Sequence, residues 1–438
     1  METLGKDHVE HLARTTGFVK RSSRVNGKNF LDLLLSHATQ GALLSLEDLS
    51  RDFEVAHEAS ISKQGLDERF TSAAVLFLKS ILNALMDNHM LGIPQSGTEK
   101  RFTSCRLRDS TRFGLPEEYA SKYKGHGGAT QTKSMISIQH EFDVLTGHQL
   151  DLQLTSGCQN DQGDSSQSIK DVKEGELLIR DLGYVTTTYL SGVTKQRAYF
   201  LNRLPSQINV YDPGSNELIN LKNVYKKLKR YNIPYIEFNV LIGKKAQLPC
   251  RLVVSACEDN AAKKRLKRTT RNTKSTGHKV SEETRWRSRL NLYITNAPEE
   301  KIHAKDVYHV YRMRWQIELI FKVWKSIANI DKLKKVKMER FECILLSGLI
   351  WVLANWKIFQ VANSWLQGLE DEPKTLSIWK YYKFIAGFPD KICSIVQAKE
   401  QMHEWLSIIL ALSESKLYRE TKKGELSHIQ LLCLLKSA

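Results

Sequence analysis

Residues 306–328, DVYHVYRMRWQIELIFKVWKSIA, constrain the fold most strongly, because their apolar side chains recur at helical spacing. At about 100° per residue, one set of these side chains falls within about 100° of one another. The set is Val310, Met313, Ile317, Ile320, Phe321 and Trp324. We therefore expect one amphipathic helix over this stretch, with that side packed against a hydrophobic core.

The same helix carries a polar stripe beside its apolar side. Tyr311, Arg314, Glu318 and Lys325 follow one another at spacings of three, four and seven residues and fall within about 60°. In an arbitrary helix, Arg314 and Glu318 would form a surface ion pair worth about 0.3–0.5 kcal/mol. A lone carboxylate flanked by two cations and a phenol also suits a metal ligand set among phosphate-binding donors. Taken alone, the stripe leaves both interpretations open.

Three strands are expected between residues 102 and 156. The segment RFTSCRLRD at 101–109 alternates, with Cys105, Leu107 and Asp109 on its apolar side. Asp109 would end this strand, where a carboxylate is costly unless it is paired or bound to a metal. Two further runs, KSMISIQHEFDV and HQLDLQLTSG, are joined by a turn at 145–147. The pattern predicts an antiparallel meander.

A polar and helical stretch around 160–174 precedes GELLIRDLGYV, in which a short buried strand ends at Asp181. A meander, a helix and a fourth strand, with acids ending the first and fourth strands, describe a ribonuclease H-like fold. Its adjacent central strands would place Asp109 and Asp181 side by side. Other carboxylates remain as alternatives, but the context of none agrees as well. They are Asp143, Asp151, Asp161 and Asp164.

Residues 186–300 contain five strand-like runs and one helix around 216–231, which predicts an inserted β-rich domain. Residues 263–289 carry eleven Lys or Arg against two Glu. Such a run is either a solvated loop or a contact with DNA phosphates, for which the candidates are Lys263, Lys264, Arg265, Lys267 and Arg268. Trp286 lies between two arginines and could stack on a base, or it could be a core residue at the head of a strand.

Helical patterns fill both ends of the chain. Within 26–92, a helix over 43–56 and another beginning at Ile61 resemble a helix-turn-helix that would present Ser62, Lys63, Gln64 and Arg69 to a DNA groove, although a structural bundle fits as well. A Pro- and Gly-containing break at 91–100 marks the first boundary. We expect a helical DNA-binding domain (1–96), a ribonuclease H-like core in two parts (97–190 and 299–365), the β-rich insertion (191–298) and a helical carboxyl-terminal region (366–438).

Composition narrows the class of partner. A length of 438 residues suggests more than one domain, and a net charge of +17 with a pI near 9.4 points to a polyanion. The longest uncharged apolar run, 343–356, is short for a membrane span and reads as a buried helix. The amino terminus lacks an apolar signal core and the seven cysteines lack metal-ligand or disulfide spacing, which predicts a cytoplasmic protein with core thiols at Cys250 and Cys257.

These motifs together resemble the insertion-sequence-four family of bacterial DDE transposases. The spacing of Tyr311, Arg314, Glu318 and Lys325 matches the Tyr-Arg-Glu-Lys signature of that family. The short motifs RDST around the first Asp, RDLGY around the second Asp and TNAP before the signature also resemble the sequences usual in the family. The resemblance covers nearly the whole chain. It implies that Asp109, Asp181 and Glu318 bind metal, that Tyr311, Arg314 and Lys325 hold phosphates at the transposon end, and that Trp286 is a candidate to stabilise a flipped base.

The implied activity is metal-dependent cleavage of double-stranded DNA at the terminal inverted repeats, followed by strand transfer into target DNA. Three carboxylates can hold two Mg²⁺ ions, with Mn²⁺ as a possible substitute. The family implies a hairpin intermediate, and paired ends imply a homodimer. Two alternatives share these residues or this charge: a structure-specific DNA nuclease of the same fold, and a catalytically silent DNA-binding regulator.

Overall fold

The computed structural model describes most of the chain. The residues outside the description are 1, 41–44, 88–100, 128–131, 276–278, 333, 370–374, 389–390, 392–393, 396–398, 413–415, 422–424 and 437–438. The break expected at 91–100 lies among them, so the boundary between residues 96 and 97 falls outside the described residues.

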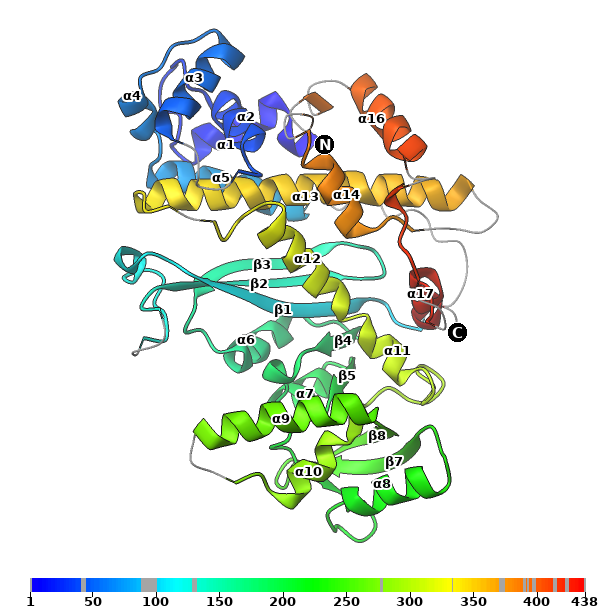
Figure 1. The fold of residues 1–438 in the computed structure, drawn as a ribbon. Coiled ribbons are helices and arrows are strands. Elements are labelled where there is room, and N and C mark those ends of the chain that lie inside the picture. Colours follow the sequence, from blue (N-terminus) through cyan, green and yellow to red (C-terminus); the bar gives the residue numbers. More distant parts are fainter. Residues whose placement is uncertain are drawn as a thin grey trace.

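The fold is mixed α/β, with helices on both faces of a large sheet (Figure 1). Within the described residues, nine strands form this sheet in the order β3-β2-β1-β4-β5-β9-β8-β7-β6. The strands are β1 (Cys105–Gly114), β2 (Met135–Asp143), β3 (Gln149–Ser156), β4 (Leu177–Arg180), β5 (Tyr199–Arg203), β6 (Val210–Tyr211), β7 (Ile236–Ile242), β8 (Leu248–Ala256) and β9 (Leu290–Thr295). The predicted meander and the strand before Asp181 are confirmed.

The direction of the strands changes across the sheet. β1, β2 and β3 are antiparallel neighbours, whereas β4 pairs parallel with β1 and β5 pairs parallel with β4. The four residues of β4 are all buried, as expected for a parallel strand covered on both faces. β5 also pairs antiparallel with β9, so the strands of the expected insertion extend the same sheet.

Helices pack on the two faces and above the sheet. They are α1 (Lys6–Thr15), α2 (Gly27–Ser36), α3 (Leu46–His57), α4 (Lys63–Asp67), α5 (Ser72–Asp87), α6 (Asp161–Gln167), α7 (Thr187–Lys195), α8 (Leu221–Arg230), α9 (Asp259–Ser275), α10 (Glu282–Ser288), α11 (Val307–Arg312), α12 (Trp315–Ser326), α13 (Met338–Leu369), α14 (Ile378–Ile385), α16 (Lys399–Leu412) and α17 (His428–Lys436). α12 crosses one face of β1–β3, where Phe321 and Trp324 pack against His140 (Figure 1). α6 covers the opposite face, where Asp164 bonds Arg108.

The stretch 306–328 is not one helix. The apolar side chains expected to face the core are all buried, but the helix is interrupted between α11 and α12. There the amides of Met313, Arg314, Gln316 and Ile317 each donate to the carbonyl three residues earlier. This tighter, 3₁₀-type turn replaces the helical bonding pattern at Arg314, which lies at the amino-terminal cap of α12.

Two expected domain boundaries fall inside helices. The boundary between 190 and 191 falls inside α7, which returns the chain to β5 as the crossover between parallel strands. The boundary between 365 and 366 falls inside α13, which continues to Leu369. The region 191–298 also contains α9 and α10 in addition to the one expected helix, α8. The basic segment 263–289, for which a solvated loop was one of the two interpretations, lies largely in α9 and α10.

The amino-terminal region is helical as expected, with one correction. Ser45 caps α3, and Ser62 caps α4 by accepting a hydrogen bond from the Gly65 amide. α4 has only five residues, and a turn separates it from α5. The helix expected to begin at Ile61 is therefore short, and the second helix of the expected helix-turn-helix is little more than one turn.

α13 is the long helix that lies beside α5, above the sheet (Figure 1). By length and apolar composition it could cross a membrane, but 78% of its most apolar window is buried inside the protein. Its side chains Trp351, Leu349 and Ile350 belong to the main hydrophobic core. The expectation of a buried core helix is confirmed. Cys250 and Cys257 are buried free thiols, also as expected.

Candidate active site

Asp109 lies in the middle of β1, not at its end as expected, because the strand continues to Gly114. Its side chain is on the α12 face of the sheet, since its cross-strand neighbour His140 packs against Trp324 of α12. One carboxylate oxygen accepts a hydrogen bond from the Ser110 amide at 2.8 Å. The side chain is 18% exposed.

Asp181 directly follows β4, as predicted. β1 and β4 are parallel neighbours whose register places Arg108 opposite Arg180. The next residue in each strand direction is an aspartate, so Asp109 and Asp181 occupy the same level of adjacent strands. Asp181 is the more open of the two, with 46% of its side chain exposed.

The Arg314 guanidinium joins the two aspartates to Glu318. Its Nη1 donates to Asp109 Oδ2 at 3.1 Å, its Nη2 donates to Glu318 Oε1 at 2.5 Å, and its Nε lies 3.9 Å from Asp181 Oδ1. The break between α11 and α12 places Arg314 at the start of α12, one turn before Glu318. Carboxylates from β1, β4 and α12 therefore converge on one cation.

The electrostatics of this cluster favour an added positive charge. Burial, with smaller contributions from Asp181 and Glu318, raises the pKa of Asp109 to about 6 against the opposing effects of the Ser110 amide and Arg314. A raised carboxyl pKa means that the ionised form is poorly compensated. Arg314 thus leaves the ionised form of Asp109 incompletely compensated.

The donor set suits a divalent metal. Carboxylate oxygens are the hard ligands that Mg²⁺ and Mn²⁺ prefer. Within the described residues, no group of three or more His, Cys, Asp or Glu side chains is placed so that it could hold a metal ion. The three acids contact Arg314 instead. The three carboxylates share the positive charge of Arg314, and their oxygen donors are of the type that a divalent metal prefers.

Tyr311 and Lys325, the other members of the polar stripe, differ in their surroundings. The Tyr311 hydroxyl is buried without a hydrogen-bond partner in the described residues, and burial raises its pKa to about 12. Its ring packs against Tyr293 of β9 at 5.2 Å. Lys325 donates to the Arg112 carbonyl of β1 at 2.9 Å, and burial lowers its pKa. The stripe therefore reaches from β9 to the far end of β1.

A cavity of about 950 Å³ adjoins Tyr311 and Arg314. Its lining is rich in cations and aromatic rings from separate parts of the chain. They are Arg203, Arg265, Lys305, Arg312, Arg314 and Arg419, with Tyr235, Tyr293, Tyr308, Tyr311 and Trp315. Arg203, Tyr293 and Arg419 did not stand out in the sequence, because a single basic or aromatic residue in a strand or loop carries no motif. The lining also holds Glu258, Glu420 and Glu425, so cations outnumber acids in it. Such an excess of cations beside aromatic rings suits a negatively charged ligand with flat rings.

The basic segment is only partly available to a partner. Lys263, Lys264, Lys267 and Arg268 are exposed on α9. Arg265 is half-buried and donates to the Leu290 carbonyl and the Asn291 side chain at 3.0 and 2.7 Å. The first four can meet a polyanion, whereas Arg265 ties α9 to β9.

Trp286 lies on α10, not at the head of a strand. It donates to Glu282 at 3.3 Å and packs near Tyr225 and under the Arg289 guanidinium. It lines a second cavity of about 410 Å³ and not the one beside Arg314. The structure therefore does not bring Trp286 together with the polar stripe.

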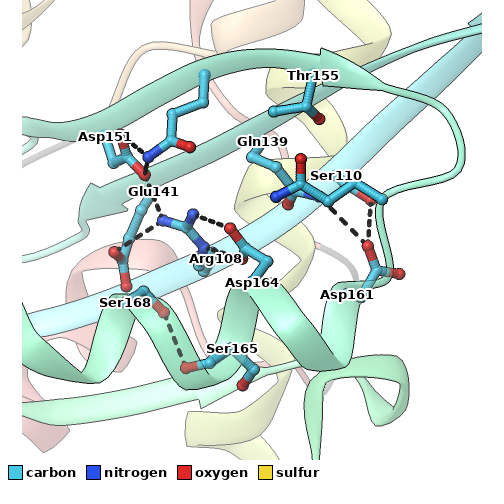
Figure 2. Close-up of polar contacts among 12 residues, drawn as sticks. Arg108, Ser110, Gln139, Glu141, Asp151, Thr155, Asp161, Asp164, Ser165 and Ser168 are labelled. Atoms are coloured by element: carbon cyan, nitrogen blue, oxygen red, sulfur yellow. Dashed lines mark hydrogen bonds and ion pairs between the residues drawn. The ribbon is translucent and has the colours of Figure 1, made fainter. Parts of the chain in front are cut away.

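The alternative carboxylates have structural partners elsewhere. Asp143 accepts from the Cys105 and Leu145 amides and stabilises the β2–β3 turn. Asp151 and Asp164 bond Arg108 on the opposite face of the sheet, and Asp161 accepts from Ser110 Oγ (Figure 2). Among the described residues, Arg314 forms its ion pairs with Asp109, Asp181 and Glu318 and with none of these alternatives.

Comparison with known proteins identifies the family. The family described as Transposase DDE domain matches residues 100–353, more than half of the chain and the range that holds all three acids. The chain belongs to the DDE transposase family. It is therefore an enzyme that cleaves DNA and joins DNA strands, and the family in general depends on a divalent metal.

Individual relatives agree along almost the whole transposase. The transposase for insertion sequence element IS231F of Bacillus thuringiensis subsp. israelensis is 30% identical over 427 residues, covering 93% of this chain and 87% of the relative. The transposase for IS1151 of Clostridium perfringens is 27% identical, covering 98% and 95%. A solved piggyBac transposase synaptic complex with hairpin DNA aligns with a TM-score of 0.47 at 10% identity over 98% of this chain and 86% of that one.

Proposed function

We propose that this insertion-sequence transposase uses Asp109, Asp181 and Glu318 as its metal-binding catalytic residues. The convergence of these three acids on Arg314, from positions up to 209 residues apart, is the observation that carries the proposal. β1 to β5 in the order 3-2-1-4-5, with α12 on one face, would form a ribonuclease H-like core. β6 to β9 with α8, α9 and α10 would be the insertion.

Asp109, Asp181 and Glu318 would hold two Mg²⁺ ions, or Mn²⁺ in their place. When bound, these ions supply Lewis-acid stabilisation of the leaving oxygen and a more acidic attacking water or 3′-hydroxyl. The acids themselves fix the position at which the scissile phosphate is engaged, because two come from the rigid centre of the sheet and one from α12.

Arg314 and Tyr311 would bind the DNA phosphates next to the cut. A guanidinium forms paired hydrogen bonds with phosphate, so Arg314 can exchange its carboxylate partners for a phosphate group. Its Nε and the Tyr311 hydroxyl are both buried without a hydrogen-bond partner among the described residues, and they are donors that such a phosphate could use. Lys325 would add positive charge farther along the same helix.

The substrate would be double-stranded DNA carrying the terminal inverted repeats of the element. Exposed cations on α9, Lys263, Lys264, Lys267 and Arg268, would neutralise phosphates outside the site. We propose nicking at the element end, attack of the freed 3′-hydroxyl on the opposite strand to give a hairpin, hairpin opening and strand transfer. A homodimer on paired ends, acting in the bacterial cytoplasm, would couple the two cuts.

A single assay separates transposase from nuclease and regulator. Purified protein is incubated with end-labelled linear DNA carrying the element end, a target plasmid and Mg²⁺, and products are resolved on denaturing gels. We expect hairpin ends and labelled DNA joined to the plasmid, both abolished by EDTA. Hydrolysed ends without joined products would favour a nuclease, and retarded but uncut DNA would favour a regulator, so either result contradicts the proposal.

A further inference from the structure

The face of β1 and β4 opposite the three acids carries a second ionic cluster, buried beneath α6 (Figure 2). Its members alternate between arginines and carboxylates of several strands and helices. They are Arg106, Arg108, Arg180, Glu141, Asp151, Asp164 and Glu176. The side chains of Arg108, Arg180 and Glu141 are 1%, 0% and 1% exposed.

Glu141 is the common anion of this cluster. It lies directly opposite Arg108 in the β1–β2 register, and Arg108 lies opposite Arg180 in the β1–β4 register. Its Oε2 accepts from Arg108 Nη1 at 3.2 Å, and its Oε1 accepts from Arg180 Nη2 at 3.4 Å. Arg106 adds two bonds at 3.2 and 2.9 Å. One carboxylate on β2 thus connects the two strands that carry Asp109 and Asp181.

Arg108 and Arg180 immediately precede the candidate metal ligands Asp109 and Asp181. Successive side chains of an extended strand point to opposite faces, so the direction of each arginine determines the direction of the aspartate that follows. Arg108 is further held by two 2.6 Å bonds to Asp164, and Arg180 by a 3.1 Å bond to Ser165 of α6 and by the Tyr189 ring.

Stability alone does not account for such a cluster. Buried ion pairs can often be replaced by packed apolar side chains without loss of stability, whereas they do specify one geometry over its alternatives. Burial would raise the pKa of Glu141, but Arg180, Arg106 and Arg108 outweigh it and lower the pKa to about 2. Glu141 is therefore ionised, and each of its oxygens has a defined guanidinium partner.

We propose that Glu141 is a positioning residue for the metal site, acting through Arg108 and Arg180 to set the separation and direction of Asp109 and Asp181. This inference rests on the proposed function of the three acids. Glu141 does not contact substrate or metal, because it lies on the opposite face of the sheet. Its effect is transmitted across one peptide unit in each strand.

The test measures Mn²⁺ binding to the full chain by electron paramagnetic resonance of the free ion, with folding checked by circular dichroism. The matched control is Glu176→Gln, because Glu176 belongs to the same cluster but pairs with Arg106, which precedes neither aspartate. We expect Glu141→Gln to raise the Kd for Mn²⁺ at least tenfold and Glu176→Gln to change it less than twofold. Asp109→Asn, measured in parallel, should remove binding.

A second pair of variants covers the case in which Glu141→Gln does not fold. Glu141→Asp keeps the charge but shortens the side chain by one methylene, which breaks the long bond to Arg180, and Glu176→Asp is its control. We expect a Kd raised about fivefold for the first and unchanged for the second. Equal changes in the paired variants, or a wild-type Kd in the Glu141 variants, would overturn the positioning role. Mn²⁺ binding that is indifferent to Asp109→Asn would instead overturn the proposed metal site and this inference with it.

Discussion

Two clusters of arginine and carboxylate occupy opposite faces of the same pair of strands, and they are built differently. On the α6 face, three arginines meet four carboxylates, and the central pair, Arg108 and Glu141, is almost fully buried. On the α12 face, one arginine meets three carboxylates whose side chains are 18% to 46% exposed. The first cluster is nearly neutral, and the second keeps an excess of negative charge.

The pKa values show the same contrast. Glu141 is the more buried carboxylate, and burial opposes its ionisation, yet its three guanidinium partners lower its pKa to about 2. Burial and the neighbouring acids raise the pKa of Asp109 to about 6. A compensated cluster fixes geometry, whereas an undercompensated and accessible one is ready to bind cations. We therefore call the α6 face of β1 and β4 the supporting face, and the α12 face, which carries Asp109, Asp181 and Glu318, the reacting face.

The largest expected effect is on the reacting face. Asp181→Asn removes one proposed ligand without a steric change, and we expect the rate of DNA-end cleavage to fall on the order of 10⁴-fold, comparable to losing one catalytic group. Thermal stability should be unchanged, since Asp181 is half exposed. Cleavage within tenfold of wild type on a denaturing gel would remove Asp181 from the site. Glu174→Gln is the control, because its exposed carboxylate pairs with Arg197 and belongs to neither cluster.

The supporting face should respond in stability. Glu141→Gln leaves buried guanidiniums without their shared anion, and we expect the free energy of unfolding to fall by about 3–5 kcal/mol in urea titrations. Asp109→Asn should not be destabilising, because the carboxylate that it removes is poorly compensated. If both variants lost the same stability, the contrast between the two faces would disappear.

A divalent metal should stabilise the folded protein only by binding to the acids of the reacting face. At a Mn²⁺ concentration of about 100 times the Kd, ligand linkage raises the free energy of unfolding by about 2.7 kcal/mol. We expect a corresponding rise in the melting temperature of the wild type and its absence in Asp109→Asn. An equal shift in both proteins would place the ion elsewhere.

Acid should affect the two faces in opposite directions in metal-free protein. The folded pKa of Asp109 is about 6 against an ordinary 3.8, so the folded state binds more protons between these values and gains stability as the pH falls through 6. The gain is at most about 1.4 kcal/mol per pH unit. We expect wild type to approach the stability of Asp109→Asn between pH 7 and pH 4. Glu141 stays ionised over this range, and its contribution is lost only as the pH falls from about 4.5 through 2. A stability difference between the two proteins that does not vary with pH would contradict the raised pKa.

The smallest expected effect is on DNA affinity, through the exposed cations of α9 that belong to neither cluster. Replacing Lys263, Lys264, Lys267 and Arg268 of α9 by Ala should reduce the slope of log affinity against log salt by about 0.9 for each phosphate that these side chains neutralise in the wild type. Arg265→Ala is the comparison, because Arg265 is held by Leu290 and Asn291 and its replacement should act on stability. If replacing all four residues left the slope unchanged, this side of α9 would not face DNA.

The sequence predicted the elements that local patterns specify. Alternation indicated the meander and the strand before Asp181, and helical spacing indicated the buried side of α12. Asp109 was misplaced to a strand end because polar residues at 110–112 hid the continuation of β1. The sequence patterns did not predict the break at Arg314 or the helix α9. Both depend on contacts with distant parts of the chain, which local sequence patterns do not reveal.

The ionic cluster of the supporting face could not be predicted from the sequence, although two features of the sequence are consistent with it. Arg106 and Arg108 alternate with buried residues in one strand, and an arginine precedes an aspartate twice, at 108–109 and 180–181. Their partner Glu141 lies more than 30 residues away from both Arg108 and Arg180. Only the pairing of β2, β1 and β4 brings the three together.

The most direct test of the proposed metal site is DNA cleavage by the variant Glu318→Gln, since Glu318 is the acid that the helix α12 contributes. The variant is compared with wild type on the same labelled DNA end in Mg²⁺, with binding followed by gel retardation, and Glu425→Gln serves as a control because its carboxylate pairs with Arg312 outside the three acids. We expect DNA binding to be retained and cleavage to be lost in Glu318→Gln alone. Cleavage at the wild-type rate would contradict the proposed site.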